Sequence, residues 1–247
     1  MKKRIQLLKR KIMTNDDFVK LVFTFILFTS LTACSQAIVI IKDSVAYKSE
    51  IFIVEEVKFP LKNRQSIAIQ NQIQNTNQIF NKPNYESSEK RLRAKKDTLQ
   101  YLIKNEELAH YNYGFEHYTI LYQNNKFLNL SIQLQSYGSA FESINYLAFD
   151  RTNGEKIDEK YFIDTEKIKK LIKEKLKSQG QFIRLSDESL SNFAINTDSE
   201  DKISGITFII YDEENYRNSG YEQFEVHFKW DEIEPYMSNI FKSILLN

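Results

Sequence analysis

Residues 127–137 read FLNLSIQLQSY and carry the clearest strand pattern in the chain. Apolar residues stand at every second position from Leu128 to Leu134, and polar residues fill the positions between them. This period of two is typical of a β-strand that buries one face and keeps the other face polar. The stretch therefore predicts a strand, and the segments beside it predict the sheet to which it belongs.

Those neighbouring segments extend the strand into a meander. The strand-like run His117–Gln123 comes first and is joined to it by the polar turn Asn124-Asn125-Lys126. A third strand, Ser143–Asp150, ends at Arg151-Thr152-Asn153-Gly154, where Asn-Gly supplies the left-handed residues of a tight turn. We therefore expect residues 117–160 to form an antiparallel meander.

Two helices and two strands are predicted after the meander. The first helix begins at Asp164 or Thr165 and is followed by Gly180 as its C′ residue. The strands are Gly205–Tyr211 and Phe224–Trp230, and the last helix starts at about Glu234. The residues expected to face inward are Ile168, Leu171, Ile172 and Leu176 in the first helix and Met237, Ile240, Phe241 and Ile244 in the second.

Before the meander, the pattern predicts one strand and two helices. The strand covers 49–60, with Ile51, Ile53, Val57 and Phe59 on its buried face. The helices lie within 64–81 and 86–109, with inner stripes at Ile69, Ile73 and Phe80 and at Leu92, Leu99, Leu102 and Ile103. The fold class is α+β, an antiparallel meander with helices packed on one face. We expect residues 49–112 and 113–247 to form one compact unit.

The N-terminal region predicts export. Residues 21–36 read LVFTFILFTSLTACSQ, an apolar run with basic residues before it, which is typical of a signal peptide. The run is shorter than the roughly 20 apolar residues that a membrane-spanning helix needs. We assign 1–33 to the signal peptide and 34–48 to a tether, with either Met1 or Met13 as the start.

Cys34 is the only cysteine, and it follows Leu-Thr-Ala directly. This arrangement resembles the bacterial lipoprotein signal, which implies that Cys34 is lipidated and anchors the protein to a membrane. Ser35 in place of Asp implies, by the same resemblance, an outer-membrane protein that faces the periplasm in a Gram-negative host. With Cys34 lipidated, no thiol remains for a disulfide, a zinc thiolate site or a nucleophile.

Charge and motifs exclude several function classes. Residues 1–33 hold seven of the 34 basic and two of the 33 acidic residues, so the remainder has a net charge of −4 and no nucleic-acid footprint. The histidines, His110, His117 and His227, have no zinc-site spacing. Asp212-Glu213-Glu214-Asn215 lacks the spacing and glycine of a calcium loop. Without a Gly-x-Ser-x-Gly or phosphate-loop motif, we expect no enzyme, metal or cofactor.

The second half resembles the extracytoplasmic domain of the lysozyme-sensing anti-sigma factor of Gram-positive bacteria, and related domains that accompany peptidoglycan deacetylases. The matching segments are Asn124–Tyr137, Tyr137–Ala140, Phe149-Asp150 with Thr152–Gly154, Tyr161-Phe162, the spaced pattern Tyr216, Gly220 and Val226–Phe228, and Glu232–Met237. The resemblance implies an α+β domain that binds a protein or glycan ligand through its loops and is not an enzyme. A histidine that the family places after its Gly-Ala pair is replaced by Phe141, so no role of that histidine transfers.

The loop aromatics are the candidate binding residues. They stand beside small residues in two loops, and aromatic side chains at loop tips serve as interface anchors or stack on sugar rings. The candidates are Tyr137, Ser139, Phe141, Tyr216 and Tyr221. The alternative for each is ordinary packing, because the chain holds 14 Tyr and 18 Phe.

Together these observations predict a lipid-anchored protein of the cell envelope that engages a lysozyme-like hydrolase as inhibitor, immunity factor or sensor. The first alternative is a peptidoglycan-binding or scaffolding lipoprotein, and the second is an enzyme that acts on peptidoglycan. The six lysines between Lys167 and Lys177 are either the solvated face of a packed helix or a surface for anionic membrane or glycan.

Overall fold

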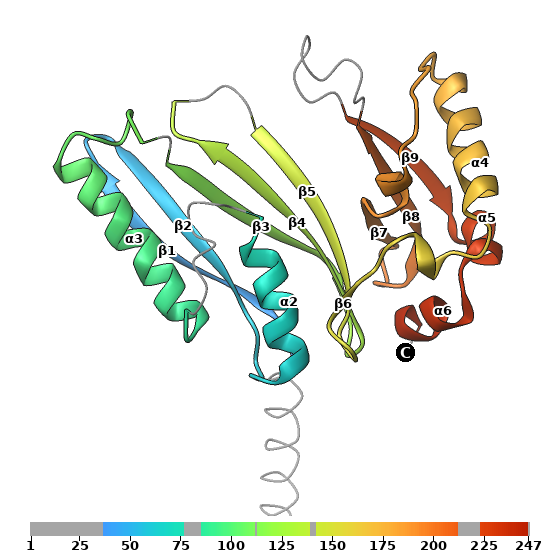
Figure 1. Cartoon of the computed structure of the whole chain (residues 1–247), viewed down its shortest axis with the longest axis horizontal. Coiled ribbons are helices and arrows are strands. Elements are labelled where there is room, and N and C mark those ends of the chain that lie inside the picture. Colours follow the sequence, from blue (N-terminus) through green and yellow to red (C-terminus); the bar gives the residue numbers. More distant parts are fainter. Residues whose placement is uncertain (1–36, 77–84, 112, 139–141, 212–222, 247) are drawn as a thin grey trace, which may run out of the picture. The chain divides into compact units, whose positions relative to one another are not determined.

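The computed structural model describes residues 37–246, apart from 77–84, 112, 139–141 and 212–222. Ala37–Asn247 form one compact unit. Within the described residues the strands fall into three antiparallel sheets, and helices pack against them (Figure 1). The predicted α+β class with antiparallel strands is confirmed, although the strands form separate sheets instead of one.

The first sheet is a hairpin of β1 (Val39–Tyr47) and β2 (Glu50–Lys58). The tether expected over 34–48 is therefore wrong for residues 39–47. The apolar run at the start of β1 pairs with the end of β2, and the preceding residue, Ile38, is buried. The backbone N–H of Ile38 donates to Gln123 Oε1 at 2.9 Å, and its carbonyl accepts from Gln123 Nε2 at 3.0 Å.

The second sheet is the predicted meander. Its strands pair in chain order and are β3 (Gly114–Gln123), β4 (Phe127–Ser136), β5 (Glu142–Asp150) and the short β6 (Glu155–Lys156). Gly154 has the positive φ of 83° that the turn requires. A side chain there would meet the backbone of Gln65 at 3.0 Å, so glycine also permits the close approach of helix α2 (Arg64–Gln74).

The third sheet contains β7 (Phe193–Thr197), β8 (Ile203–Tyr211) and β9 (Gln223–Lys229) in that order. The last two strands were predicted from the sequence. Strand β7 was not, because five residues of mixed polarity are too few to show a clear period.

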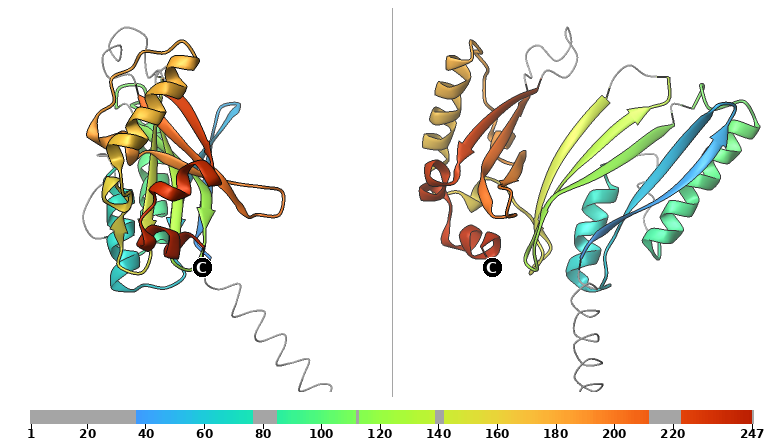
Figure 2. Two further views of the ribbon diagram at one scale, coloured as in Figure 1. Left: turned by 90° about the vertical axis from the view of Figure 1, so that its right-hand side faces the viewer. Right: turned by 180° about the vertical axis from the view of Figure 1, so that it is seen from behind.

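Helices α2, α3 (Ser88–Lys104) and α4 (Thr165–Ser178) lie on the same side of the strands, as predicted (Figure 2). Each begins at a polar cap: the side chains of Asn63, Ser87 and Asp164 accept hydrogen bonds from backbone N–H groups of the first turn. Helix α4 ends before Gly180, whose φ is +80°. Its buried residues include Ile168, Ile172 and Leu176, as the sequence predicted.

The C-terminal segment differs from the single helix expected from Glu234. It contains α5 (Trp230–Ile233), the 3₁₀ turn η4 (Glu234–Tyr236) and α6 (Asn239–Leu245). The helix breaks at Met237, whose backbone is extended and forms a β-bridge with Phe162. Because α6 starts at Asn239 and buries Phe241 and Ile244, Ile240 lies on the opposite side and is 64 % exposed, not buried.

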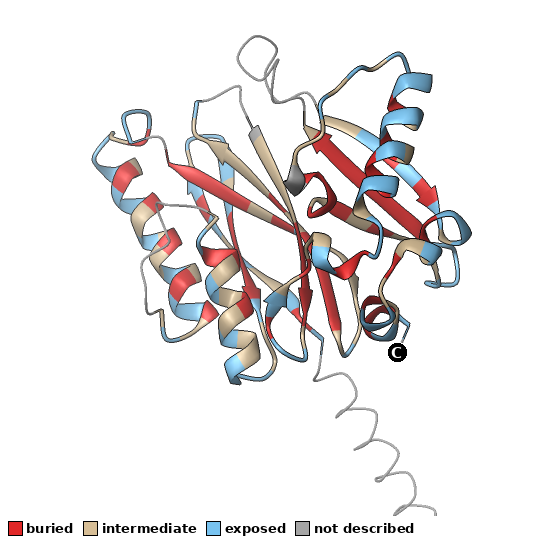
Figure 3. Ribbon diagram, turned by 45° about the vertical axis from the view of Figure 1, so that its right-hand side comes forward, coloured by how far each residue is buried: buried red, intermediate tan, exposed pale blue. Residues whose placement is uncertain are grey.

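Buried residues follow one side of each long helix and the strands beneath it (Figure 3). The largest apolar cluster lies among α4, α6 and the third sheet, and it contains Phe127, Phe162, Phe193, Phe208, Phe228 and Phe241. Two 3₁₀ turns, η2 (Glu159–Tyr161) and η3 (Asp187–Leu190), border this part of the chain. Among the described residues, every helix is too short or too polar to cross a membrane.

Candidate functional site

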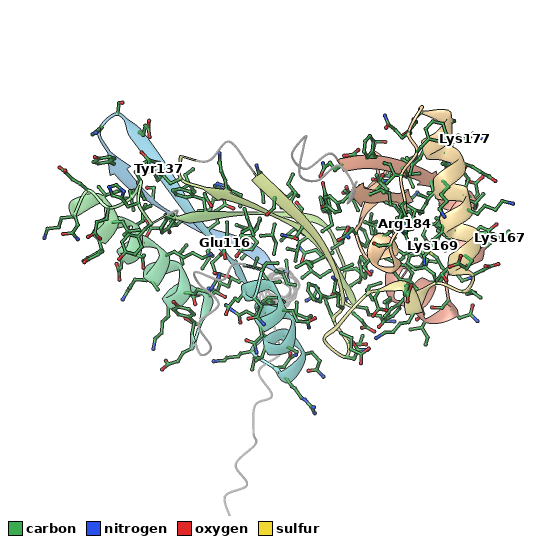
Figure 4. The ribbon with its side chains drawn as sticks, turned by 45° about the horizontal axis from the view of Figure 1, so that its top comes forward. Glu116, Tyr137, Lys167, Lys169, Lys177 and Arg184 are labelled. Carbon is green, nitrogen blue, oxygen red and sulfur yellow. The ribbon has the colours of Figure 1, made fainter. Side chains whose placement is uncertain are left out.

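Of the predicted binding residues, the structure places Tyr137. Cys34, Ser139, Phe141, Tyr216 and Tyr221 lie outside the described residues. Tyr137 follows the last residue of β4, and its backbone N–H donates to the Tyr113 carbonyl at 2.8 Å. In Figure 4 it lies beside the tip of the β1–β2 hairpin. Its ring meets Phe52 edge-on, with 5.9 Å between centroids.

Tyr137 borders a groove of about 340 Å³ between the hairpin and the meander, called the Tyr137 groove below. Its lining residues are Ile51, Phe52, Ile53, Phe115, His117, Gln135, Ser136, Tyr137 and Gly138. Ile51 is 71 % exposed and Ile53 is 43 % exposed. The expectation that these two isoleucines face the interior is therefore wrong. Residues 51–54 are all apolar, so their pattern does not reveal which face is inside.

An aromatic chain forms the floor of the Tyr137 groove. Phe52 of β2 stacks on Phe115 of β3 at 5.6 Å, and Phe115 stacks on His117 at 6.5 Å. Tyr113 packs edge-on against Phe115 at 4.8 Å. The groove thus presents aliphatic side chains at its rim and aromatic rings at its base, a composition typical of protein or sugar contacts.

Tyr137 also lines a second groove of about 370 Å³. It is lined by Tyr47, Lys48, Ile103, Glu106, Leu108, Ala109 and Tyr137. Lys48 Nζ lies 4.9 Å from the centroid of the Tyr47 ring. Lys48, in the hairpin turn, and Glu106, after the end of α3, both have positive φ angles, 54° and 60°. Tyr137 is therefore shared by the two grooves.

The Tyr137 groove exists because β2 and β3 are close in space but are not hydrogen-bonded to each other. Further along the two strands, a hydrogen bond joins them directly: the Tyr118 N–H of β3 donates to Glu55 Oε2 of β2 at 2.9 Å. Helix α3 covers the same end of β2, because Lys95 Nζ donates to the Glu55 carbonyl and Ser88 Oγ donates to the Val57 carbonyl at 2.7 Å. The other end of the two strands is left open.

A buried ionic cluster of Glu56, Arg91, Lys95 and Glu116 lies next to this junction, between α3, β2 and β3. Arg91 makes two 2.9 Å bonds to the Glu116 carboxylate and also pairs with Glu56. Lys95 Nζ lies 2.9 Å from Glu56 and also pairs with Glu116. The two cations thus neutralise the two carboxylates in the interior of the protein, away from water. Because Glu116 stands between Phe115 and His117, the ionic cluster fixes the strand that forms the groove floor.

The charges around this junction shift several pKa values. Burial raises the pKa of Glu55, but hydrogen bonds from His117, Lys42 and the Tyr118 N–H outweigh it and lower the pKa to about 2. Burial also opposes ionisation of Glu116, yet Lys95 and Arg91 hold its pKa below the usual value. Burial raises the pKa of Tyr118 well above normal, and the nearby carboxylates raise it further. These groups therefore stay in fixed charge states near neutral pH.

The sequence pattern does not reveal the groove residues on β2 and β3 or the ionic cluster. One available signal was the spacing of Arg91, Lys95, Leu99 and Leu102, which places the two cations on the buried stripe of α3. The other was the pair Glu55-Glu56 inside an apolar strand.

Several of the other residues singled out in the sequence have structural partners, whereas residues 212–215 lie outside the described part of the chain. Among the described residues, no group of three His, Cys, Asp or Glu side chains is arranged to hold a metal. His227 Nδ1 lies 3.0 Å from Asn196 Nδ2. On α4, Lys175 pairs with Glu232 at 3.1 Å, and Lys167 lies over the Tyr236 ring at 5.2 Å. Asp231 and Glu232 lie in the first turn of α5, where a negative charge is favoured.

Comparison with known proteins finds similarity in fold. No protein-family model matches the sequence, and no curated protein does. A crystal structure of a DUF3298-family member from Bacteroides fragilis superposes with a TM-score of 0.58 at 11 % identity, covering 86 % of this chain and 99 % of that one. A DUF3298-family protein from Pseudomonas aeruginosa gives a TM-score of 0.47 at 9 % identity, covering 83 % and 96 %. The chain shares its fold with the Bacteroides protein, whose family has no known function.

Proposed function

We propose that this chain is a lipid-anchored protein of the cell envelope that binds a lysozyme-like cell-wall hydrolase through the Tyr137 groove. Its role would be that of an inhibitor, an immunity factor or a sensor. The observation that carries the proposal is the groove itself, in which two exposed isoleucines surround a floor of aromatic rings. An exposed apolar surface beside polar groups marks interaction sites in soluble domains.

Three features support this choice of partner and place. The N-terminal sequence with Cys34 resembles a lipoprotein signal, which would hold the protein where cell-wall enzymes act. The second half resembles a lysozyme-sensing domain at segments that include Asn124–Tyr137, and Tyr137 borders the groove. The net charge of −4 without residues 1–33 favours a basic partner. The proposed role is binding without catalysis.

Mixing a soluble fragment of residues 37–247 with a panel of lysozyme-type muramidases tests the proposal. We expect a complex by size-exclusion chromatography and loss of lytic activity with at least one of them. Ile51→Asp should weaken that complex at least tenfold, because it places a charge at the apolar rim. Phe182→Asp is the matched control: Phe182 is 82 % exposed and lies outside both grooves. Absence of a complex with every enzyme tested would refute the proposal.

The alternative partner is peptidoglycan, because aromatic rings such as Tyr137 and His117 can stack on sugars. Sedimentation of the same fragment with insoluble peptidoglycan distinguishes the two, since a hydrolase inhibitor need not co-sediment. The proposed anchor has its own test. Cys34→Ala should abolish incorporation of labelled fatty acid, and a variant that is still labelled would contradict the anchor.

A further inference from the structure

We propose that the partner contributes an extended peptide segment that adds as a third strand to the free edge of β2 at Ile51–Ile53. This inference deepens the proposed function, since it names how a protein would occupy the Tyr137 groove. It concerns the backbone of β2 and not only the side chains around it.

The register of the hairpin shows which backbone groups are free. Tyr47 pairs with Glu50 across the two-residue turn, and hydrogen-bonded pairs alternate from there along the ladder. Ile51 and Ile53 therefore occupy non-hydrogen-bonded positions opposite Ala46 and Ser44. At such positions the N–H and C=O groups point away from the partner strand, so those of Ile51 and Ile53 point away from β1.

The backbone groups of the next residues along β2 also point away from β1, in agreement with this alternation. The Glu55 carbonyl receives Lys95 Nζ and the Val57 carbonyl receives Ser88 Oγ, and both donors come from α3. The outward edge of β2 is thus covered by side chains at 55 and 57. Within the described part of the chain no backbone bond joins this edge to another strand, and at Ile51 and Ile53 it borders the groove.

Proteins normally protect such an edge with charged side chains, proline or a covering element, because it is a template for another strand. Here the edge carries two exposed isoleucines instead. An extended peptide is the ligand that satisfies N–H and C=O groups repeating every second residue, and it lies about 4.8 Å from the strand it joins. Its alternate side chains would then contact Phe115, His117 and Tyr137, which line the groove.

The test uses the full chain in non-ionic detergent and a fluorescent nine-residue peptide of alternating valine and threonine. Two further peptides carry N-methyl groups on every second residue, so that each blocks one hydrogen-bonding edge. We expect the unmodified peptide to bind and one methylated peptide to lose at least tenfold in affinity. No binding, or equal binding of all three, would overturn the inference.

A protein variant tests the same edge from the other side. Ile53→Pro removes an N–H that β1 does not use, whereas Ile53→Val keeps it as the matched control. We expect at least tenfold weaker peptide binding for the proline variant alone. In case that variant fails to fold, hydrogen exchange on the wild-type chain gives a second readout. The peptide should slow exchange at Ile51 and Ile53 at least tenfold and leave Val54 unchanged, and unaltered exchange at both isoleucines would contradict the inference.

The outcomes separate this inference from the proposed function. A hydrolase complex that is weakened by Ile51→Asp and unaffected by Ile53→Pro would keep the hydrolase and refute strand addition. Peptide binding without any hydrolase complex would support strand addition and refute that partner. Dimerisation of the chain that Ile53→Pro abolishes would mean that a second copy occupies the edge, which also overturns the choice of partner.

Discussion

Helices α3 and α4 both pack on antiparallel strands, but the two interfaces differ in chemistry. Helix α4 presents Ile168, Ile172 and Leu176 to an apolar core rich in phenylalanine. Helix α3 places the charges of Arg91 and Lys95 against strands that carry Glu56 and Glu116. An apolar core tolerates a change of shape, whereas a buried ion pair requires both partners in place. We infer that the ionic cluster fixes the hairpin and the meander in one arrangement beside the groove.

The largest expected effect is the loss of one member of the ionic cluster. Arg91→Met should lower the free energy of unfolding by about 3–5 kcal/mol, because Glu56 and Glu116 then share one cation while buried. Urea denaturation followed by circular dichroism measures this change. The double variant Arg91→Met/Glu116→Leu should be more stable than Arg91→Met alone, since Lys95 and Glu56 then remain as a balanced pair. A double variant that loses the sum of the two single losses would contradict this coupling.

A conservative change in the phenylalanine core should cost less. Phe208 is fully buried and contacts Phe162, Phe193 and Phe228. Phe208→Leu should lower the free energy of unfolding by about 1.5 kcal/mol, because neighbouring rings can partly fill the space. The same denaturation experiment measures it. A loss as large as that of Arg91→Met would remove the distinction between the two interfaces.

Acid should lower the stability of the region where α3 packs on β2 and β3, and Glu55 is the group through which it acts. Its pKa in the folded chain is about 2, below the usual 4.5, so the carboxylate stabilises the fold above about pH 4.5. That stability is lost as the pH falls from about 4.5 towards 2. Its partners Lys42 and His117 are partly exposed, so screening limits the effect to about 1 kcal/mol. Glu55→Gln should show a smaller difference between the urea midpoints at pH 6 and pH 3, and an unchanged difference would contradict this assignment.

The smallest effect is expected at a hydrogen bond that links the third sheet to the meander. The Tyr211 hydroxyl of β8 donates to the Ile144 carbonyl of β5, and burial raises its pKa to about 12. Tyr211→Phe removes this bond and should lower the free energy of unfolding by about 0.5–1 kcal/mol. Tyr101→Phe on α3 is the control, because Tyr101 is 59 % exposed and its hydroxyl makes no hydrogen bond to another described residue. Equal losses for the two variants would argue against a specific link.

The two regions also differ in how well the sequence predicts them. The meander and α4 follow from simple periods, because Leu128–Leu134 alternate cleanly and α4 has a cap at each end. The region where α3 packs on β2 and β3 does not follow such simple periods. Arg91 and Lys95 are charged residues on a buried stripe, and only their partners on β2 and β3 make that burial possible. Partners 21 or more residues away cannot be identified from one sequence.

The candidate site was predictable only at Tyr137. Its position beside Gly138 at the end of a strand indicated a loop aromatic, and the groove lies there. Ile51 and Ile53 were assigned to the wrong side because residues 51–54 show no polar alternation. The groove also depends on two strands that approach without pairing, and no local pattern records that arrangement.

Strand β1 limits how far the groove can lie from a bilayer. With the proposed lipid on Cys34, only residues 35–37 precede the buried Ile38, so the chain spans at most about 14 Å between them. The nine residues of β1 then rise by roughly 30 Å to the hairpin tip beside the grooves. A strand is stiff where a tether is not. The proposed anchor would therefore keep the groove within about 45 Å of the lipid.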